Sequence, residues 1–473
     1  MLTHKGIPFQ RFWLLVAGIG MLASCATYHQ KNMELMSAVQ DGRIDEAGKI
    51  LEKPKAEGRK KDALLYYFNR GTVYWMLRDP VNSNKYFQQA DYYIEDFQKN
   101  YVNDALGLLS NPMVEPYAGE GFEQILLHYY TTLNYIQLGN FEGALVECKR
   151  MQLKMQRIND TYKGKNSYKR DAFAHLLTGI IYDAQKNYND AFIAYRNAYE
   201  VYRDDYKGQL NTAIPEQLKY DLIRTAYRTG FYDEVRMYEY EFGRKYQPAC
   251  DSCGSLLVFW NNGLGPVKDE WSINFFIAPA GDNAVVFYNP ELNIRMHFPT
   301  SDEHQKKDLS DLKIIRVAFP KYVTREPLFT GALLAIDSLP ADTAGFQMAE
   351  PINAIAYKSL NDRMMKEFGE ALLRLAIKQI TESQVKKKNE GLGAVVGLIN
   401  AITEQADTRN WQLLPYAIYY KRITLPAGKH QVILQPQGGD VANASRSADV
   451  LIQPDELNIQ FFYNQQFKKY SKN

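Results

Sequence analysis

The first half of the chain carries apolar positions that recur at intervals of three and four residues, the period of amphipathic helices. From about Asn32 to Tyr246, glycine and proline fall mostly in the polar segments between these runs. The clearest unit runs from Asp171 to Tyr199. Small residues and tyrosines share its helical spacing, at Gly179, Tyr182, Tyr188, Ala191, Tyr195 and Ala198. Small residues let two antiparallel helices approach closely, and the tyrosines fill the gaps around them.

The same offsets recur elsewhere in this half, so the pattern is a repeat. Further copies are marked by Gly71, Tyr74, Phe87 and Ala90, by Tyr135, Gly139, Phe141 and Ala144, and more weakly by Gly42, Ile44 and Ala47 and by Gly230, Tyr232 and Val235. The spacing resembles the tetratricopeptide repeat, and five such units predict a short solenoid with a concave groove. A groove of this kind usually holds a peptide or helix of a partner protein. Packing alone would select the same tyrosines, and we favour packing as their role.

Beyond Gly254 the period changes from that of helices to that of strands. Short β-rich runs, separated by glycine, proline and asparagine, lie at residues 256–260, 273–277, 284–288, 314–319, 416–424, 431–435, 449–453 and 457–463. Runs of this length and composition predict a sheet.

The helical period returns once in the second half, from residue 352 to about residue 388. Leu360 and Phe368 lie on one apolar face of this segment, which should pack against the predicted sheet. The whole pattern predicts an α+β protein. An all-α tetratricopeptide-like helical solenoid over residues 32–246 precedes a mixed α/β C-terminal domain over residues 247–473.

The N-terminal segment has the features of a secretion signal. Lys5 and Arg11 supply a basic start, and the apolar run over residues 12–21 is too short to span a bilayer. The run leads into Leu22-Ala23-Ser24-Cys25, which resembles the lipobox of bacterial lipoproteins. That resemblance implies removal of residues 1–24 as a lipoprotein signal peptide, diacylation of the Cys25 thiol, and acylation of the new amine, with a fatty acid such as palmitate.

A lipid on Cys25 would place the protein in the bacterial cell envelope. Residues 25–31 would form a short lipidated tether ahead of the first helix. Ala26 follows the cysteine, and in the enteric sorting rule an aspartate there would retain the protein in the inner membrane. We therefore expect the outer membrane, facing the periplasm. Inner-membrane or surface locations stay open, because other phyla use other signals.

The charge balance narrows the choice of partners. Lys and Arg number 56 and Asp and Glu number 54, for a formal net charge of +2. A balanced surface argues against nucleic acid, which selects for clustered positive charge. It also argues against a polybasic membrane patch, so the lipid chains would anchor the protein.

The remaining cysteines suggest no catalytic thiol. Cys148 lies in a predicted helix and is most simply a small buried hydrophobe. Cys250 and Cys253 form a Cys-x-x-Cys between Pro248 and Gly254. A redox motif would place the first cysteine at a helix N-terminus, and a zinc site would need two further ligands with paired spacing. A local disulfide or two idle thiols in a loop fits the sequence better.

Two glycine-rich segments invite a nucleotide-binding interpretation and do not meet its requirements. The segment 262–268 reads Asn-Gly-Leu-Gly-Pro-Val-Lys, but a phosphate loop needs Gly-Lys-Ser/Thr leading into a helix. We interpret it as a structured turn with Lys268 at its edge. The segment 391–397 lacks a preceding strand and the third glycine spacing of a dinucleotide fingerprint. It is better explained as a closely packed helix, so we predict no cofactor.

The candidate catalytic and metal residues each have a structural explanation. His128 and His175 occupy equivalent positions in separate repeats, where we expect each to fill a helix interface rather than bind metal. Asp407 and Arg409 could serve a hydrolase only with further groups, and an ion pair beside buried Trp411 explains them more simply. A pocket that joined Asp407, Arg409, Lys268 and His430 would favour an enzyme.

Several motifs together resemble one family. The lipobox, the helical repeats and the segment 262–268 occur with Ala-Asp-Thr-Arg-Asn-Trp-x-x-Leu-Pro at 406–415 and Leu-Pro-Ala-Gly-x-His at 425–430. This combination is similar to a family of uncharacterised bacterial envelope lipoproteins with tetratricopeptide-like repeats and a shared mixed C-terminal domain. The resemblance implies an architecture and no activity.

The sequence thus predicts a membrane-anchored lipoprotein that acts as a non-enzymatic, protein-binding scaffold. The helical-repeat groove would bind the protein partner, and the lipid on Cys25 would anchor the protein in the membrane. Two alternatives stay open. One is a regulator, in the sense of an activator, of a cell-wall synthesis enzyme, by analogy of architecture alone. The other is an envelope hydrolase with its site in the C-terminal domain.

Overall fold

The computed structural model describes most of the chain after the predicted signal. The described residues are 28–53, 60–100, 113, 115–161, 168–248, 250–281, 284–299, 306, 314–337, 345–388, 406–439 and 444–468. Cys25 and the segment 391–397 lie outside the described residues. Within these ranges, none of the helices combines the length and apolar character that a bilayer span requires.

Antiparallel helical pairs fill the first half of the chain, and the described part contains five of them. The pairs are α3 (Met33–Gln40) with α4 (Ile44–Glu52), α5 (Ala63–Met76) with α6 (Pro80–Asn100), α7 (Gly121–Gln137) with α8 (Phe141–Thr161), α9 (Ala172–Ala184) with α10 (Tyr188–Val201), and α12 (Glu216–Thr229) with α13 (Tyr232–Phe242). The short elements around them are α2 (Tyr28–Lys31), η1 (Lys60–Asp62), the π-helical turn η3 (Tyr202–Tyr206) and α11 (Lys207–Gln209). The predicted tetratricopeptide-like stack is confirmed.

Glycines at the helix crossings explain why the pairs pack so closely. A Cβ added to Gly179 on α9 would lie 2.5 Å from the ring of Tyr195 on α10. The equivalent contact in the second pair joins Gly71 to the ring of Phe87, at 2.7 Å. The ring of one helix therefore occupies the space that a larger residue on its partner would need, as the repeat pattern predicted.

The second half forms three sheets and one long helix, α15 (Ile352–Lys388). The first sheet has the order β11 (Leu457–Asn464), β1 (Cys253–Asn262), β8 (Ala417–Pro426) and β7 (Gln347–Glu350). The second has the order β10 (Arg446–Ile452), β9 (Gly428–Gln437) and β6 (Gly331–Ile336). The third has the order β4 (Ile294–Pro299), β3 (Ala284–Asn289), β2 (Val267–Pro279) and β5 (Ile314–Val323). Strands β1 and β11 run parallel, and the other neighbours are antiparallel.

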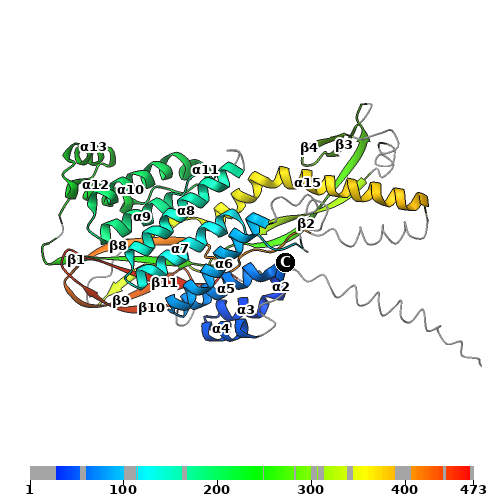
Figure 1. Cartoon of the computed structure of the whole chain (residues 1–473). Coiled ribbons are helices and arrows are strands. Elements are labelled where there is room, and N and C mark those ends of the chain that lie inside the picture. The colour runs from blue at the N-terminus through cyan, green and yellow to red at the C-terminus, as the bar shows by residue number, and fades with distance from the viewer. Residues whose placement is uncertain are drawn as a thin grey trace, which may run out of the picture.

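Strand β1 is the centre of the protein because both of its faces are buried. Leu257 and Phe259 point into the core shared with the helices, whereas Val258 and Trp260 point into the core shared with the second sheet. The fold is thus layered as helices, first sheet and second sheet (Figure 1). The third sheet extends to one side, where Phe368 of α15 covers it as predicted.

The inner face of the repeat stack is made by the first helix of each pair, and it is not an open groove. Phe68 of α5 stacks on Trp411 with ring centroids 4.2 Å apart. The Tyr129 hydroxyl of α7 donates to Asn261 of β1 at 2.9 Å. In Figure 1 the helices lie directly over β1, β8 and β11. The groove that was predicted to hold a partner is therefore filled by the chain's own sheet. An apolar helix face in a sequence predicts that the face is covered, but it does not identify the element that covers it.

Candidate functional site

The two most distinctive segments of the second half fit into each other. The backbone N–H of Gly265 donates to the Leu414 carbonyl at 2.7 Å, and the Asn410 side chain donates to the Pro266 carbonyl at 2.9 Å. Gly263 has φ +68°, in the left-handed region that favours glycine. The segment 262–268 is thus a structured turn, as predicted. Its backbone groups form hydrogen bonds with the segment that carries Asn410 and Leu414.

Lys268 is buried in an ion cluster rather than facing a ligand. Its ammonium pairs with Glu120, the N-cap residue of α7, and Arg363 of α15 pairs with the same carboxylate. Burial alone would raise the pKa of Glu120, but Arg363 and Lys268 outweigh it and lower the pKa to about 2. Lys268 therefore ties the sheet to the first turn of a repeat helix.

Asp407 and Arg409 form the structural ion pair that the sequence suggested. The Arg409 Nε and Nη2 groups donate to the two oxygens of Asp407 at 2.9 and 2.8 Å. A third donor, Nη1, reaches the Glu115 carbonyl at 2.9 Å, and the guanidinium lies 5.3 Å from the Tyr117 ring centre. The pair fixes the segment that carries Trp411 against the repeats.

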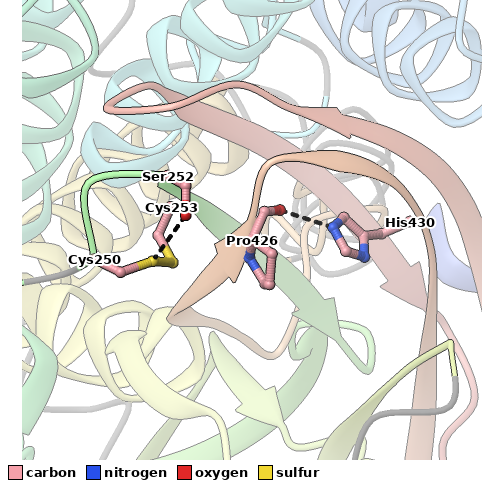
Figure 2. The surroundings of a disulfide bond; sticks show 5 residues. All are labelled: Cys250, Ser252, Cys253, Pro426 and His430. Carbon is pink, nitrogen blue, oxygen red and sulfur yellow. Dashed lines mark hydrogen bonds between the residues drawn. A yellow bond between two sulfur atoms is a disulfide. The ribbon is translucent and has the colours of Figure 1, made fainter.

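His430 lies apart from these groups, near the start of β9 rather than on the turn that precedes it. Its Nδ1 is 2.7 Å from Asp337. Its Nε2 is 2.9 Å from the Pro426 carbonyl, a contact shown in Figure 2. The Pro426 carbonyl and the Asp337 carboxylate both raise the pKa of His430. Of the four residues considered for a hydrolase, His430 thus lies apart, whereas Lys268 and the Asp407–Arg409 pair make neighbouring structural contacts, with the Lys268 backbone N–H donating to Asn410. The pocket that would have favoured an enzyme is not formed by them.

The histidines of the repeats fill helix interfaces, as expected. His128 of α7 lies 2.7 Å from Glu147 of α8, and His175 of α9 lies 3.4 Å from Gln152 of α8. Nowhere in the described ranges do three or more His, Cys, Asp or Glu side chains gather as metal ligands would. Cys148 is buried, which confirms its predicted packing role.

Sequence reasoning missed a large polar cleft at the end of the repeat stack. Its volume is about 800 Å³, and it lies where the last helical pair and the loop after it meet β1, β8 and the turn before β11. The lining residues are mostly polar or charged, with Pro248 and Leu457 as the aliphatic exceptions. No local motif marks it because its residues come from positions 183 to 457.

A buried ion cluster forms the floor of this cleft. Arg224 of α12 and Arg422 of β8 both bind Asp183 of α9 and Asp221 of α12, with Arg224 Nη1 3.0 Å from Asp183 and Arg422 Nη1 3.0 Å from Asp221. Burial alone would raise the pKa of Asp183, but the two guanidinium groups outweigh it and lower the pKa. Two carboxylates and two guanidinium groups thus form a neutral, rigid floor.

Tyrosine and arginine side chains form the walls. The Arg244 guanidinium lies 4.8 Å from the ring centre of Tyr220, and the Arg228 guanidinium lies 5.3 Å from that of Tyr188. Arg228 also pairs with Asp455 on the turn before β11. The Tyr220 hydroxyl donates to the Gln247 carbonyl at 2.9 Å, which holds the loop after α13 against α12.

A disulfide closes the rim of the cleft. Cys250 and Cys253 are bonded, with their Cα atoms 5.2 Å apart, and Figure 2 shows the bond at the start of β1. This confirms the local disulfide and gives neither cysteine the helix N-terminus that a thioredoxin-like motif uses. The backbone N–H of Asp455 donates to the Cys253 carbonyl at 2.9 Å, so the rim is fixed to the turn before β11.

A second buried carboxyl pair joins α9 to β7 without any arginine. The Tyr168 hydroxyl lies 2.9 Å from Asp171 and 3.2 Å from Glu350, and the Tyr206 hydroxyl donates to Glu350 at 2.9 Å. Burial, and next the charge of Asp171, raise the pKa of Glu350 well above its usual range. Burial thus favours the protonated form of Glu350, and the two hydroxyl groups join the two carboxyls.

The sequence matches no protein-family model and no curated protein. Among solved structures it is similar to the apo form of RapI, with 16% identity, a TM-score of 0.30, and 49% of this chain and 69% of that chain covered. It is also similar to BtubC (BKLC) from P. vanneervenii, with 14% identity, a TM-score of 0.33, and coverage of 51% and 89%. A further match is to kinesin-light-chain-type TPR-like repeats from Podosopora anserina, with 13% identity, a TM-score of 0.30, and coverage of 46% and 97%. Likenesses this partial assign the chain to no family.

Proposed function

We propose that the protein is a lipid-anchored scaffold of the bacterial envelope that binds a protein partner on the outer face of its repeats. The anchor is the lipid on Cys25, as the lipobox-like Leu22-Ala23-Ser24-Cys25 implies. The disulfide between Cys250 and Cys253 supports export, because disulfides persist in oxidising compartments such as the periplasm. The tether is short, since the first described helix begins at Tyr28, three residues after Cys25.

The main support for this location of the partner site is that the chain's own sheet fills the inner face of the repeats. A partner must therefore bind elsewhere, and the second helices of the pairs are the exposed ones. Val81 and Tyr92 of α6 are 64% and 71% exposed and lie three helical turns apart, hence on one side. Val146 and Leu153 of α8, two turns apart, are 54% and 46% exposed. We call these two pairs of exposed apolar residues the apolar stripes, although exposed polar residues such as Lys85 and Arg150 lie between their members, and we assign the partner site to them.

The experiment is site-specific photocrosslinking in intact cells. A photoreactive amino acid at Tyr92 or Val146 is expected to capture a partner, which mass spectrometry then identifies. The matched control is Asp233, which is on α13 and whose side chain is 88% exposed. A cell-wall synthesis enzyme as the captured partner would support the regulatory form of the proposal. Equal capture from Asp233 and from the apolar stripes would contradict an interface on those stripes.

The anchor is tested separately. In a Cys25→Ala variant, labelling by a radioactive fatty acid should be lost, and the protein should leave the membrane fraction. A Cys148→Ala variant is the matched control and should keep both properties, because Cys148 is buried. Persistent labelling of Cys25→Ala would overturn the lipoprotein assignment.

A further inference from the structure

The terminal cleft has the size of a small-ligand site but an unusual lining. Ligand pockets usually measure about 300–1,000 Å³ and are mostly apolar, with a few polar groups that fix orientation. The cleft falls within that range at about 800 Å³, yet its walls offer few apolar contacts. An apolar ligand would leave the charged and amide groups of the cleft without hydrogen-bond partners, which costs free energy.

The charges around the cleft nearly cancel, which argues against a polyanion. The lining carries Arg224, Arg228, Arg244, Lys245 and Arg422 together with Asp183, Asp251, Asp455 and Glu456. Most of these groups already neutralise one another: Arg224 and Arg422 bind Asp183, and Arg228 binds Asp455. A phosphate-rich or acidic ligand would need an excess of cations that the lining lacks.

A protein segment is also a poor fit. Interfaces with peptides depend on aromatic or aliphatic anchors buried in apolar pockets. Pro248 and Leu457 are the aliphatic side chains in the described lining, and no apolar socket is built around them. The cleft is therefore distinct from the outer apolar stripes proposed to bind a protein.

The lining does offer what a hydroxyl-rich ligand requires. Gln217, Gln247, Ser255 and Thr424 supply donors and acceptors together, and Asp251 and Glu456 supply further acceptors. Tyr188, Tyr220 and Tyr246 supply aromatic rings on the walls, which can pack against the C–H faces of a sugar ring.

The site is also preorganised. The ion cluster beneath it is buried, with the side chains of Arg224 and Asp183 only 11% and 2% exposed. The disulfide closes the loop at the rim, and the hydrogen bond from Tyr220 to Gln247 ties that loop to α12. A rigid site loses less conformational entropy when a ligand binds.

From this lining we infer that the terminal cleft binds a neutral oligosaccharide. The side-chain amides and hydroxyls hydrogen-bond the sugar hydroxyls, the tyrosine rings contact the sugar faces, and the ion cluster holds the floor. The disulfide keeps the rim in the binding conformation.

The test uses the full-length mature protein, with its disulfide intact, and isothermal titration calorimetry. The probes are maltotetraose, cellotetraose and chitotetraose, with an acidic tetrapeptide and inorganic polyphosphate as the charged competitors. At least one of the three sugars should bind, with an affinity that changes less than about twofold between 50 and 500 mM salt, because the ligand is uncharged. Binding by none of the three sugars, or binding by a charged probe alone, would overturn the inference.

Two variants locate the site. Gln247→Ala and Arg244→Ala should each weaken sugar binding at least fivefold, without changing the thermal unfolding midpoint by more than about 2 °C. Arg236→Ala is the matched control, because Arg236 is an exposed arginine of α13 outside the cleft lining. Sugar binding that is unchanged in both cleft variants would place the sugar elsewhere and contradict the assignment. Loss of photocrosslinking at Tyr92 with retained sugar binding would count against the scaffold proposal alone.

Discussion

Two buried carboxyl pairs hold the helices to the sheet, and they do so by opposite means. Asp183 and Asp221 are bound by two arginines, and the charges of those arginines lower the pKa of Asp183 despite its burial. In the second pair, Asp171 and Glu350 contact tyrosine hydroxyls instead of arginines, and burial together with the charge of Asp171 raises the pKa of Glu350. The first arrangement tolerates a rise in pH, and the second does not. The contact between the helices and the first sheet, called the seam below, therefore contains one ion cluster that weakens only as pH falls and one carboxyl pair that weakens as pH rises.

The largest effect should follow removal of one arginine from the first pair. Arg422→Ala leaves Asp183 and Asp221 with a single guanidinium in a buried site, which should lower the free energy of unfolding by about 3–5 kcal/mol. Urea unfolding followed by circular dichroism measures this. Adding Asp183→Asn to Arg422→Ala removes the uncompensated charge and should recover part of the loss. A loss below about 1 kcal/mol would show that the cluster does not stabilise the seam.

The aromatic contact between α5 and the sheet segment should come next. Trp411 is fully buried and stacks on Phe68, so Trp411→Ala should lower the free energy of unfolding by about 3–5 kcal/mol through the cavity it leaves. Trp411→Phe keeps the stacking and should cost markedly less. Equal losses in the two variants, measured by urea unfolding, would contradict a role for ring packing.

The second carboxyl pair should give the seam its pH dependence. The folded-state pKa of Glu350 is raised, so its protonated form favours folding, and that contribution is lost as pH rises from about 4.3 through the folded pKa. Glu350→Gln imitates the protonated acid and should flatten this decline by about 1.4 kcal/mol for each pKa unit removed. Chemical unfolding between pH 5 and 9 measures the slope. An unchanged slope in Glu350→Gln would assign the pH dependence elsewhere.

Close helix packing should produce a smaller effect. Gly179→Ala places a methyl group against the Tyr195 ring and should cost about 1–3 kcal/mol. Gly208→Ala is the matched control, because a Cβ there meets no atom within 4 Å. Thermal unfolding distinguishes the two. Similar midpoints for both variants would show that the Gly179 crossing can relax.

The smallest effect on stability belongs to the outer face. Tyr92→Glu should change the free energy of unfolding by no more than about 0.5 kcal/mol, because Tyr92 is exposed. The same substitution should reduce crosslinking of the proposed partner from Val146. Full crosslinking in Tyr92→Glu would place the partner outside this stripe.

The periodic parts of this fold could be predicted from the sequence. Gly179 and Tyr195 sit at the offsets of a close helix pair, and the strand predicted at residues 256–260 is the central part of β1. The packing of α15 on a sheet could be predicted, but the element that covers the inner face of the repeats could not. Trp411 and Phe68 are far apart in sequence, and nothing local says that they stack. For the same reason the cleft escaped prediction, whereas the disulfide at its rim was within reach because its two cysteines are close in sequence.

Cysteine accessibility tests most directly whether the sheet seals the inner face of the repeats. Thr72 of α5 is fully buried and its hydroxyl accepts from the Trp411 indole N–H at 3.1 Å, whereas Val81 of α6 is exposed. In the native protein, Thr72→Cys should resist a maleimide reagent and react only on unfolding, and Val81→Cys should react at once. Labelling of Thr72→Cys as fast as Val81→Cys under native conditions would contradict a sealed inner face.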